Sequence, residues 1–139
     1  MEKEKVIFIC TGNSCRSQMA EGLLRDIAGD RFEVFSAGTH PSIVHPNAIA
    51  VMEEIGIDIS GHSSDGIDGY ISAGMDTVIT VCDSANQSCP VFPGDINRMH
   101  WSISDPFSGW DLNPDQLDSF RECRETIRER IKEYISHSG

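Results

Sequence analysis

The sequence predicts a three-layer α/β domain with a mostly parallel sheet, and three observations support this prediction. Short apolar runs rich in β-branched residues alternate with longer segments whose apolar residues recur with the period of a helix. The runs are apolar throughout, which is typical of parallel strands that are buried on both faces. The length of 139 residues fits one domain of ordinary size, and we expect residues 1–139 to form a single domain.

The first half of the chain provides two strands and two helices. Residues 6–9 are a continuous apolar run that predicts the first strand, and residues 32–36 predict the second. Between them an apolar helical face begins after Ser17 and ends before Gly29, and it consists of Met19, Ala20, Leu23, Leu24, Ile27 and Ala28. A second helix begins at His45 and Pro46 and ends at Gly56, and its expected inward residues are Ile49, Met52 and Ile55.

The second half provides the remaining elements. A short helix is expected over residues 67–73, a third buried strand over residues 77–81 and a fourth strand over residues 99–103. The last helix has the clearest signals, with Asn113 to cap it, Pro114 in its first position and Gln116 to complete a capping box. Its apolar stripe, with Cys123 and Tyr134 beside it, consists of Leu117, Phe120, Ile127, Ile131 and Ile135. In sheets of this kind ligands bind at the carboxyl ends of the strands.

The charge distribution excludes some classes of partner. The chain has 22 acidic and 11 basic residues, a net charge of −11, and no Lys or Arg from Phe32 to Asn97. Nucleic acids and anionic membrane surfaces are bound by basic faces, so we expect neither partner. The N-terminal apolar run is too short for the core of a signal peptide, and no stretch approaches the ~20 apolar residues of a membrane span. We therefore expect a cytoplasmic protein.

Residues 10–17, between the first strand and the first helix, read Cys-Thr-Gly-Asn-Ser-Cys-Arg-Ser. A loop at the N-terminus of a helix directs several backbone N–H groups to one point and so forms an anion site. Arg16 can bind two oxygens of a tetrahedral oxyanion, and the same positive field favours the thiolate of Cys10, which Ser17 can stabilise further. The predicted oxyanion-binding residues are Thr11, Gly12, Asn13, Ser14, Cys15, Arg16 and Ser17. The alternative is a buried cysteine followed by an ordinary turn.

The five cysteines are Cys10, Cys15, Cys82, Cys89 and Cys123, an odd number without a CxxC pair, so we expect no framework of structural disulfides. Cys82 ends the third strand, and Cys89 follows a polar, turn-rich segment. A disulfide between them requires that segment to loop back, because seven residues of helix rise about 10.5 Å. Two incidental thiols are the alternative, whereas the spacings do not match the usual zinc sites. Cys15 is expected to be a small filler of the loop, and Cys123 a core residue.

The segment CTGNSCRS, followed by QMAEG, resembles the phosphate-binding loop of the low-molecular-weight protein tyrosine phosphatase superfamily. Within it the residues are most similar to those of the thioredoxin-coupled arsenate reductases. The resemblance continues through Ser36-Ala37-Gly38, Ile57-Asp58-Ile59-Ser60, Ser64-Asp65, Cys82-Asp83, Cys89-Pro90, His100-Trp101 and Asp105-Pro106. It implies a four-stranded parallel sheet flanked by helices, and an enzyme that reduces arsenate to arsenite in arsenic detoxification.

The resemblance also implies the role of each thiol. Cys10 attacks arsenic, while Asp105, whose Asp-Pro sequence is equally common in simple turns, protonates the leaving oxygen. Cys82 then attacks Cys10 and releases arsenite, Cys89 attacks Cys82, and thioredoxin reduces the resulting disulfide. We expect a monomer without a tightly bound cofactor. In some reductases of this type the positions of Asn13, Glu21, Ser36 and Asp65 hold a potassium ion, and here these residues form either that site or a hydrogen-bonded brace.

Two other functions stay open. Cys10, Arg16 and Asp105 alone suffice for a low-molecular-weight phosphatase that hydrolyses aryl phosphates through a Cys10 phosphoenzyme, and weak phosphatase activity could accompany arsenate reduction. Phe107 and Gln18 depart from the tyrosine and the proline that are common in those phosphatases, which weakens this alternative. A non-enzymatic protein that binds oxyanions or senses redox state could use the same loop. The five histidines show no ligand spacing and are expected to be surface or hydrogen-bonding residues.

Overall fold

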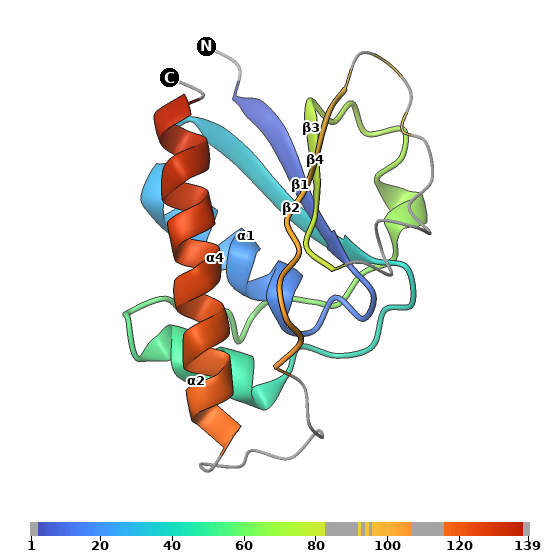
Figure 1. Ribbon diagram of the computed structural model, residues 1–139. Coiled ribbons are helices and arrows are strands. Elements are labelled where there is room, and N and C mark those ends of the chain that lie inside the picture. Colours follow the sequence, from blue (N-terminus) through green and yellow to red (C-terminus); the bar gives the residue numbers. More distant parts are fainter. Residues whose placement is uncertain (1–2, 83–91, 93, 95, 107–115, 138–139) are drawn as a thin grey trace.

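Four parallel strands form the centre of the computed structural model, which describes residues 3–82, 92, 94, 96–106 and 116–137 (Figure 1). The strands are β1 (Glu4–Cys10), β2 (Phe32–Gly38), β3 (Thr77–Thr80) and β4 (Asn97–His100), and their order in the sheet is β2-β1-β3-β4. All three strand pairs are parallel, which confirms the predicted sheet. Because β1 and β3 are neighbours, the residues that follow their carboxyl ends lie close together.

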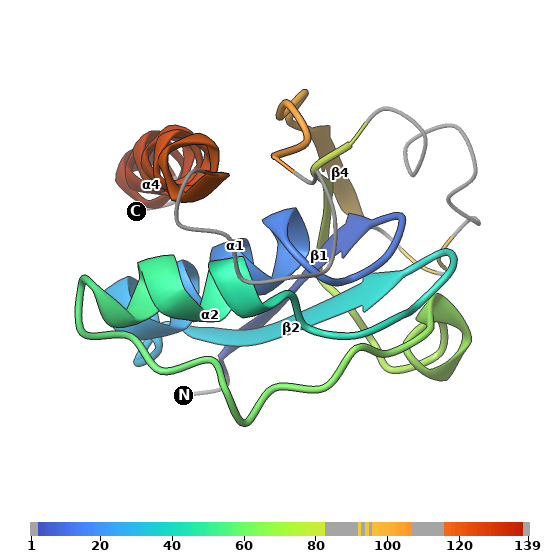
Figure 2. The same ribbon diagram turned by 90° about the horizontal axis from the view of Figure 1, so that it is seen from below.

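Two long helices cover one face of the sheet. Helix α1 (Arg16–Ala28) follows β1 directly, and α4 (Leu117–His137) packs against it on the same side (Figure 2). The Tyr134 ring of α4 contacts the rings of Phe32 and Trp101, at centroid distances of 5.6 and 6.4 Å. The predicted stripe of α4 is confirmed in its centre, where Phe120, Ile127 and Ile131 are fully buried. Asn113 and Pro114, which were expected to begin this helix, lie outside the described residues.

The opposite face is covered in part by the segment around η1 (Ile67–Gly69). The ring of Tyr70 lies 5.6 Å from that of Phe35, a residue of β2 whose side chain points away from α1 and α4. The sequence predicts a helix over residues 67–73, but the structure has only one turn of 3₁₀-helix there, at Ile67–Gly69.

Three further details differ from the sequence prediction. The fourth strand begins two residues earlier than expected and ends at His100, because the apolar side chains of Trp101 and Ile103 enter the core from irregular backbone. Ile27, expected to face inward, has 42% of its surface exposed at the edge of the apolar face of α1. In α2 (Pro46–Glu53) the buried apolar residues are Ala48, Val51 and Met52, whereas Ile49 and Ile55 are only partly buried.

Within the described parts of the chain, no helix has the length and apolar composition needed to cross a membrane.

Candidate active site

The carbonyl groups of the loop between β1 and α1 point out of the loop and are held there by hydrogen bonds. Three of them accept hydrogen bonds from backbone N–H groups of the neighbouring segment 40–45. These bonds are His40 N to Thr11 O at 2.8 Å, Ser42 N to Gly12 O at 3.1 Å and His45 N to Ser14 O at 3.0 Å. Because a trans peptide group is planar, a carbonyl that points outward directs the following N–H to the opposite side, into the loop. The loop thus presents a set of backbone donors of the kind that can bind an anion.

A cavity of about 180 Å³ opens inside this loop. It is lined by Cys10, Thr11, Gly12, Ser14, Cys15, Arg16, Ser42 and Asp105. Five of the seven predicted oxyanion-binding residues therefore line it directly. The other two, Asn13 and Ser17, are fully buried behind it and act on the loop rather than on its contents.

Cys10 is buried and lines the cavity, and its sulfur receives hydrogen bonds from its own loop. The Asn13 N–H donates to it at 3.2 Å, and the Ser17 hydroxyl oxygen lies 2.9 Å away. Since the Asn13 side-chain amide already donates to that hydroxyl oxygen at 2.8 Å, the hydroxyl hydrogen is available to the sulfur. Donors directed at the sulfur stabilise its thiolate form, which is the nucleophilic form of cysteine.

Arg16 joins the loop to the segment that follows β4. Its guanidinium donates to the carbonyl of Ile103 at 3.0 Å and lies 3.6 Å from the Asp105 carboxylate. The Arg16 side chain is only 13% exposed, whereas that of Asp105 is 52% exposed. The predicted acid thus lies at the mouth of the cavity, where it can reach both solvent and a bound oxyanion.

Cys82 follows β3 and lies beside the loop, as the strand order requires. Its sulfur is buried and lies 3.3 Å from the Thr11 hydroxyl oxygen. A second cavity of about 460 Å³ is lined by Cys82 and by Thr11, Arg16 and Asp105, which also line the first cavity. The two cavities therefore adjoin, with Cys10 and Cys15 in the first and Cys82 in the second. Cys89 lies outside the described residues.

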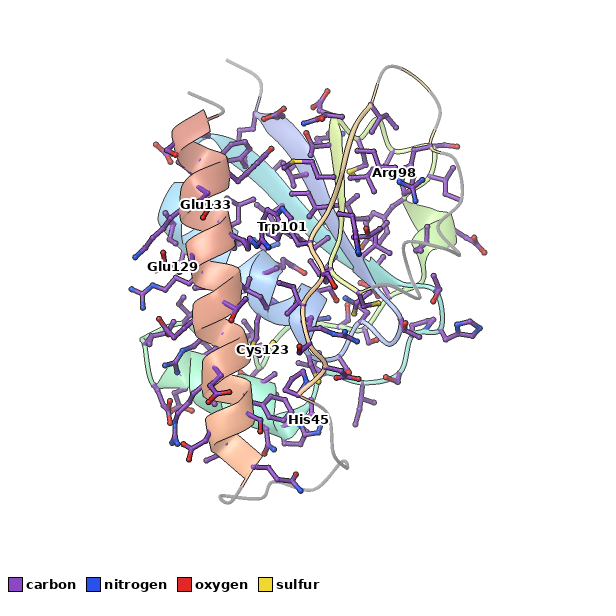
Figure 3. All side chains as sticks on the ribbon, viewed as in Figure 1. His45, Arg98, Trp101, Cys123, Glu129 and Glu133 are labelled. Carbon is purple, nitrogen blue, oxygen red and sulfur yellow. The ribbon has the colours of Figure 1, made fainter. Side chains whose placement is uncertain are left out.

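The other two cysteines of the described residues, Cys15 and Cys123, are also buried. Burial raises the pKa of Cys15 and of Cys123 to about 12, so both remain neutral thiols near pH 7. Cys123 lies on the inward side of α4 (Figure 3) and is a core residue, as the sequence predicts. Neutral buried thiols are poor nucleophiles.

The four residues of the candidate potassium site are brought together, but they are bonded to one another and to their neighbours. Asn13 donates from its amide to Ser36, Ser36 donates to Glu21, and Glu21 also accepts from Arg25 at 2.5 Å. The Asn13 amide oxygen accepts from the Asp65 N–H at 2.8 Å, and the Asp65 carboxylate accepts from Ser63 and Tyr70. The side-chain oxygens of these four residues are of the type that suits a hard cation, but each of them already accepts a hydrogen bond. This arrangement fits a hydrogen-bonded brace of the loop. Among the described residues, no group of three or more His, Cys, Asp or Glu side chains is placed to hold a metal ion.

Two residues near the loop have contacts that the sequence did not predict. Gln18 is fully buried in the first turn of α1 and hydrogen-bonds the Asn13 carbonyl and the ring of His62. Burial lowers the pKa of His62, so its ring is neutral near pH 7. The only sign of the role of Gln18 in the sequence is that a polar residue lies on the inward side of a helix, next to the loop.

The family model that describes low molecular weight phosphotyrosine protein phosphatases matches residues 5–138. The chain belongs to this family. Its curated relatives include proteins named arsenate reductase. Arsenate reductase 2 of Staphylococcus saprophyticus is 44% identical to this chain, covering 99% of it and all of the relative. The arsenate reductase of Bacillus subtilis is 42% identical and covers 96% of each chain.

Solved structures agree with this placement in the family. An arsenate reductase in its oxidized state superposes with a TM-score of 0.83 at 36% identity, covering 98% of this chain and 99% of that one. Another, in its phosphate binding state, has a TM-score of 0.74 at 36% identity and covers 96% and 98%. A thioredoxin-dependent arsenate reductase of Corynebacterium glutamicum has a TM-score of 0.75 at 31% identity and covers 97% of this chain and 61% of that one.

Proposed function

We propose that this protein is a thioredoxin-dependent arsenate reductase. The observation that carries the proposal is the position of Cys82, whose buried sulfur lies beside Thr11 in a cavity that adjoins the cavity of Cys10. A phosphatase of this family needs Cys10, Arg16 and Asp105, but it has no use for a second thiol at this place. The names of the relatives, at more than 40% identity over nearly the whole chain, support the same conclusion.

The first step is nucleophilic attack. Arsenate occupies the loop, where backbone N–H groups and Arg16 bind its oxygens. The Cys10 thiolate forms a bond to arsenic, one oxygen leaves, and Asp105 supplies the proton with which it departs as water. The product is a covalent adduct in which arsenic is still pentavalent.

The second step is the reduction. The Cys82 thiol loses its proton and attacks the Cys10 sulfur, so that a Cys10–Cys82 disulfide forms and the sulfur–arsenic bond breaks. The electron pair of that bond stays on arsenic, which leaves as trivalent arsenite. Two thiols have supplied the two electrons.

The last steps restore the enzyme. Cys89 attacks Cys82, which releases the Cys10 thiolate and moves the disulfide to Cys82–Cys89. A dithiol of thioredoxin then reduces this disulfide and becomes oxidised itself. The role of Cys89 rests on its position in the sequence, in a segment whose Asp, Ser, Asn and Gln content suits a loop.

The same proposal includes a monomeric protein of one domain without a tightly bound cofactor. It also includes a cytoplasmic location, because three free thiols need a reducing compartment. Hydrolysis of aryl phosphates is a secondary activity in this proposal. Two observations support this: Cys10, Arg16 and Asp105 line one cavity, and phosphate has nearly the shape of arsenate.

The test is NADPH consumption in the presence of thioredoxin, thioredoxin reductase and arsenate, beside an assay of aryl-phosphate hydrolysis. We expect arsenate-dependent turnover that is lost in Cys89→Ser after a single reaction, whereas Cys123→Ser, which removes a thiol outside the relay, retains it. A Cys89→Ser protein that turns over arsenate at the normal rate contradicts the three-thiol relay. Fast aryl-phosphate hydrolysis without arsenate-dependent NADPH consumption would identify a phosphatase instead.

A further inference from the structure

The side chain of Gln18 uses both of its amide hydrogens and its amide oxygen in hydrogen bonds around the oxyanion loop. Its amide nitrogen donates to the carbonyls of Asn13 at 3.0 Å and of Ser63 at 2.9 Å, and its amide oxygen lies 2.9 Å from Nδ1 of His62. Carbonyl oxygens only accept, so the amide nitrogen must face them and the amide oxygen must accept from the His62 ring. Gln18 is fully buried, and its orientation is therefore fixed.

The Asn13 carbonyl depends on this side chain. The carbonyls of Thr11, Gly12 and Ser14 accept from backbone N–H groups of the segment 40–45, and the carbonyl of Cys15 accepts from the N–H of Met19. Among the described residues, no backbone N–H reaches the Asn13 carbonyl, and Gln18 is its partner. Asn13 also has a φ of 47°, in the left-handed region that a non-glycine residue adopts at a cost. The Asn13–Ser14 peptide group therefore needs a fixed hydrogen-bond partner more than the neighbouring peptide groups of the loop do.

We propose that Gln18 is a positioning residue for oxyanion binding, because it holds the Asn13–Ser14 peptide so that the Ser14 N–H points into the loop. With the carbonyl anchored on the outer side, the planar peptide directs that N–H to the inner side, where Ser14 lines the cavity. The inference rests on the proposed function only in that the oxyanion is arsenate. Its direct consequence concerns the binding of any tetrahedral oxyanion.

Gln18 also fixes the far side of Asn13. Its hydrogen bonds to Ser63 and His62 hold the segment that leads to Asp65. The N–H of Asp65 in turn donates to the Asn13 amide oxygen at 2.8 Å. One side chain thus secures the main chain of Asn13 directly and its side chain through a neighbouring segment. Loss of Gln18 should loosen the inward donors without touching Cys10, Arg16 or Asp105.

The test is the dissociation constant of inorganic phosphate for the reduced protein, measured by titration calorimetry. Gln18→Met keeps the length of the side chain and removes its donors and its acceptor. We expect the phosphate dissociation constant and the KM for arsenate to rise about tenfold, the worth of one ordinary hydrogen bond, while kcat changes by less than about threefold. Gln116→Met, the same replacement at the residue directly before α4, is the matched control and should leave the phosphate dissociation constant unchanged.

Gln18→Glu is the second variant, and it keeps the inference testable if the methionine variant does not fold. A carboxylate would face two carbonyls and repel them, whereas a protonated carboxyl again has a donor and an acceptor. We expect its phosphate dissociation constant, divided by that of the unaltered protein at the same pH, to fall as the pH is lowered from about 8 to about 5. A role in folding alone would lower thermal stability and leave this ratio flat.

A folded Gln18→Met protein that binds phosphate as tightly as the unaltered chain would overturn the inference, as would a flat ratio for Gln18→Glu. The proposed function fails separately. A chain that does not reduce arsenate, but whose phosphate affinity depends on Gln18, would disprove the reductase and retain the positioning role.

Discussion

Asn13 shows how one residue, through its main chain and its side chain, organises the reactive loop. Its main-chain N–H donates to the Cys10 sulfur, its carbonyl accepts from Gln18, and its side chain bonds Ser17, Ser36 and the Asp65 N–H. The left-handed φ costs about 1–3 kcal/mol, and these bonds offset that cost. A glycine would adopt the backbone freely but would lose three side-chain hydrogen bonds. The requirement for asparagine is therefore chemical rather than conformational.

Asp105 gives the clearest prediction at the scale of a residue. Asp105→Asn removes the proton donor and one negative charge from the mouth of the cavity while it keeps the shape of the side chain. We expect the first-order rate of arsenite release in a single turnover to fall by roughly 10²–10⁴, the usual contribution of general acid catalysis. The phosphate dissociation constant should stay the same or decrease, because the carboxylate that repels the anion is gone.

Asp118→Asn is the matched control, since it makes the same change of charge at an exposed residue of α4. It should leave both the rate and the phosphate affinity unchanged. An Asp105→Asn protein with the normal single-turnover rate would assign the proton to another group. A large loss of phosphate affinity would mean that Asp105 holds the loop rather than the proton.

At the scale of elements, the end of β2 approaches the reactive loop closely enough to require glycine. A Cβ atom on Gly38 would lie 2.6 Å from the Thr11 carbonyl oxygen and 2.9 Å from the Asn13 nitrogen. Both are backbone atoms of the loop, so the loop itself would have to move. We expect Gly38→Ala to lower the free energy of unfolding by about 1–3 kcal/mol, as overpacking commonly does, and to weaken phosphate binding as well.

Urea denaturation and phosphate titration measure these two effects. Gly61→Ala is the control, because nothing in the described structure lies within 4 Å of its added Cβ. It should change neither quantity appreciably. If Gly38→Ala lowers stability but binds phosphate normally, the loop accommodates the methyl group without moving its donors.

A second prediction at this scale concerns the contact between α2 and α4. Glu54 follows α2 and accepts hydrogen bonds from Arg121 and Arg124 of α4, which lower the pKa of its carboxyl from 4.5 to about 2. A carboxyl with a lowered pKa stabilises the folded state above its unfolded pKa and loses this effect as the pH falls toward its folded pKa. We expect Glu54→Gln to cost about 0.5–1 kcal/mol at pH 7, because Glu54 and Arg121 are both more than a third exposed, and progressively less below pH ~4.5.

The measurement is chemical denaturation at several pH values between about 3 and 7. Glu133→Gln is the control, since it removes the same charge from an exposed position on α4 (Figure 3). In an acidic protein that change alone should be neutral or slightly stabilising. A cost for Glu54→Gln that does not depend on pH would mean that packing, not charge, joins the two helices.

The elements also show why the sequence predicted most of the site but not all of it. Residues 10–17 carry their chemistry in a local pattern, because the strand, the loop and the helix are consecutive, and the strand order then places Cys82 beside them. Gln18 gave only a weak signal, a polar residue on the inward side of a helix, since its partners Ser63 and His62 are distant in the sequence. The boundary of β4 was misplaced for a related reason. Trp101 and Ile103 are apolar because they fill the core, and periodicity alone cannot separate such residues from a strand.

At the scale of the whole molecule, the net charge of −11 opposes the binding of an anion, and the site overcomes it locally. The donors are backbone N–H groups, which carry no net charge, and the cavity is lined by one cation and one acid, Arg16 and Asp105. Outside the cavity but within a Debye length of the surface, about 30 Å at 0.01 M ionic strength, an approaching anion therefore encounters mainly the negative field of the molecule. Affinity is local, whereas the approach is governed by the global charge.

This separation predicts an unusual response to salt. When the concentration of sodium chloride is raised from about 10 to about 150 mM, kcat/KM for arsenate should rise or stay level, because the salt screens the long-range repulsion. An anion site reached through a positive field would lose affinity over the same range. The control is alkylation of Cys10 by iodoacetamide, an uncharged reagent whose rate should not follow the salt concentration. A steep fall of kcat/KM for arsenate, with a constant alkylation rate, would show that a positive local field extends beyond the cavity and outweighs the acidic surface.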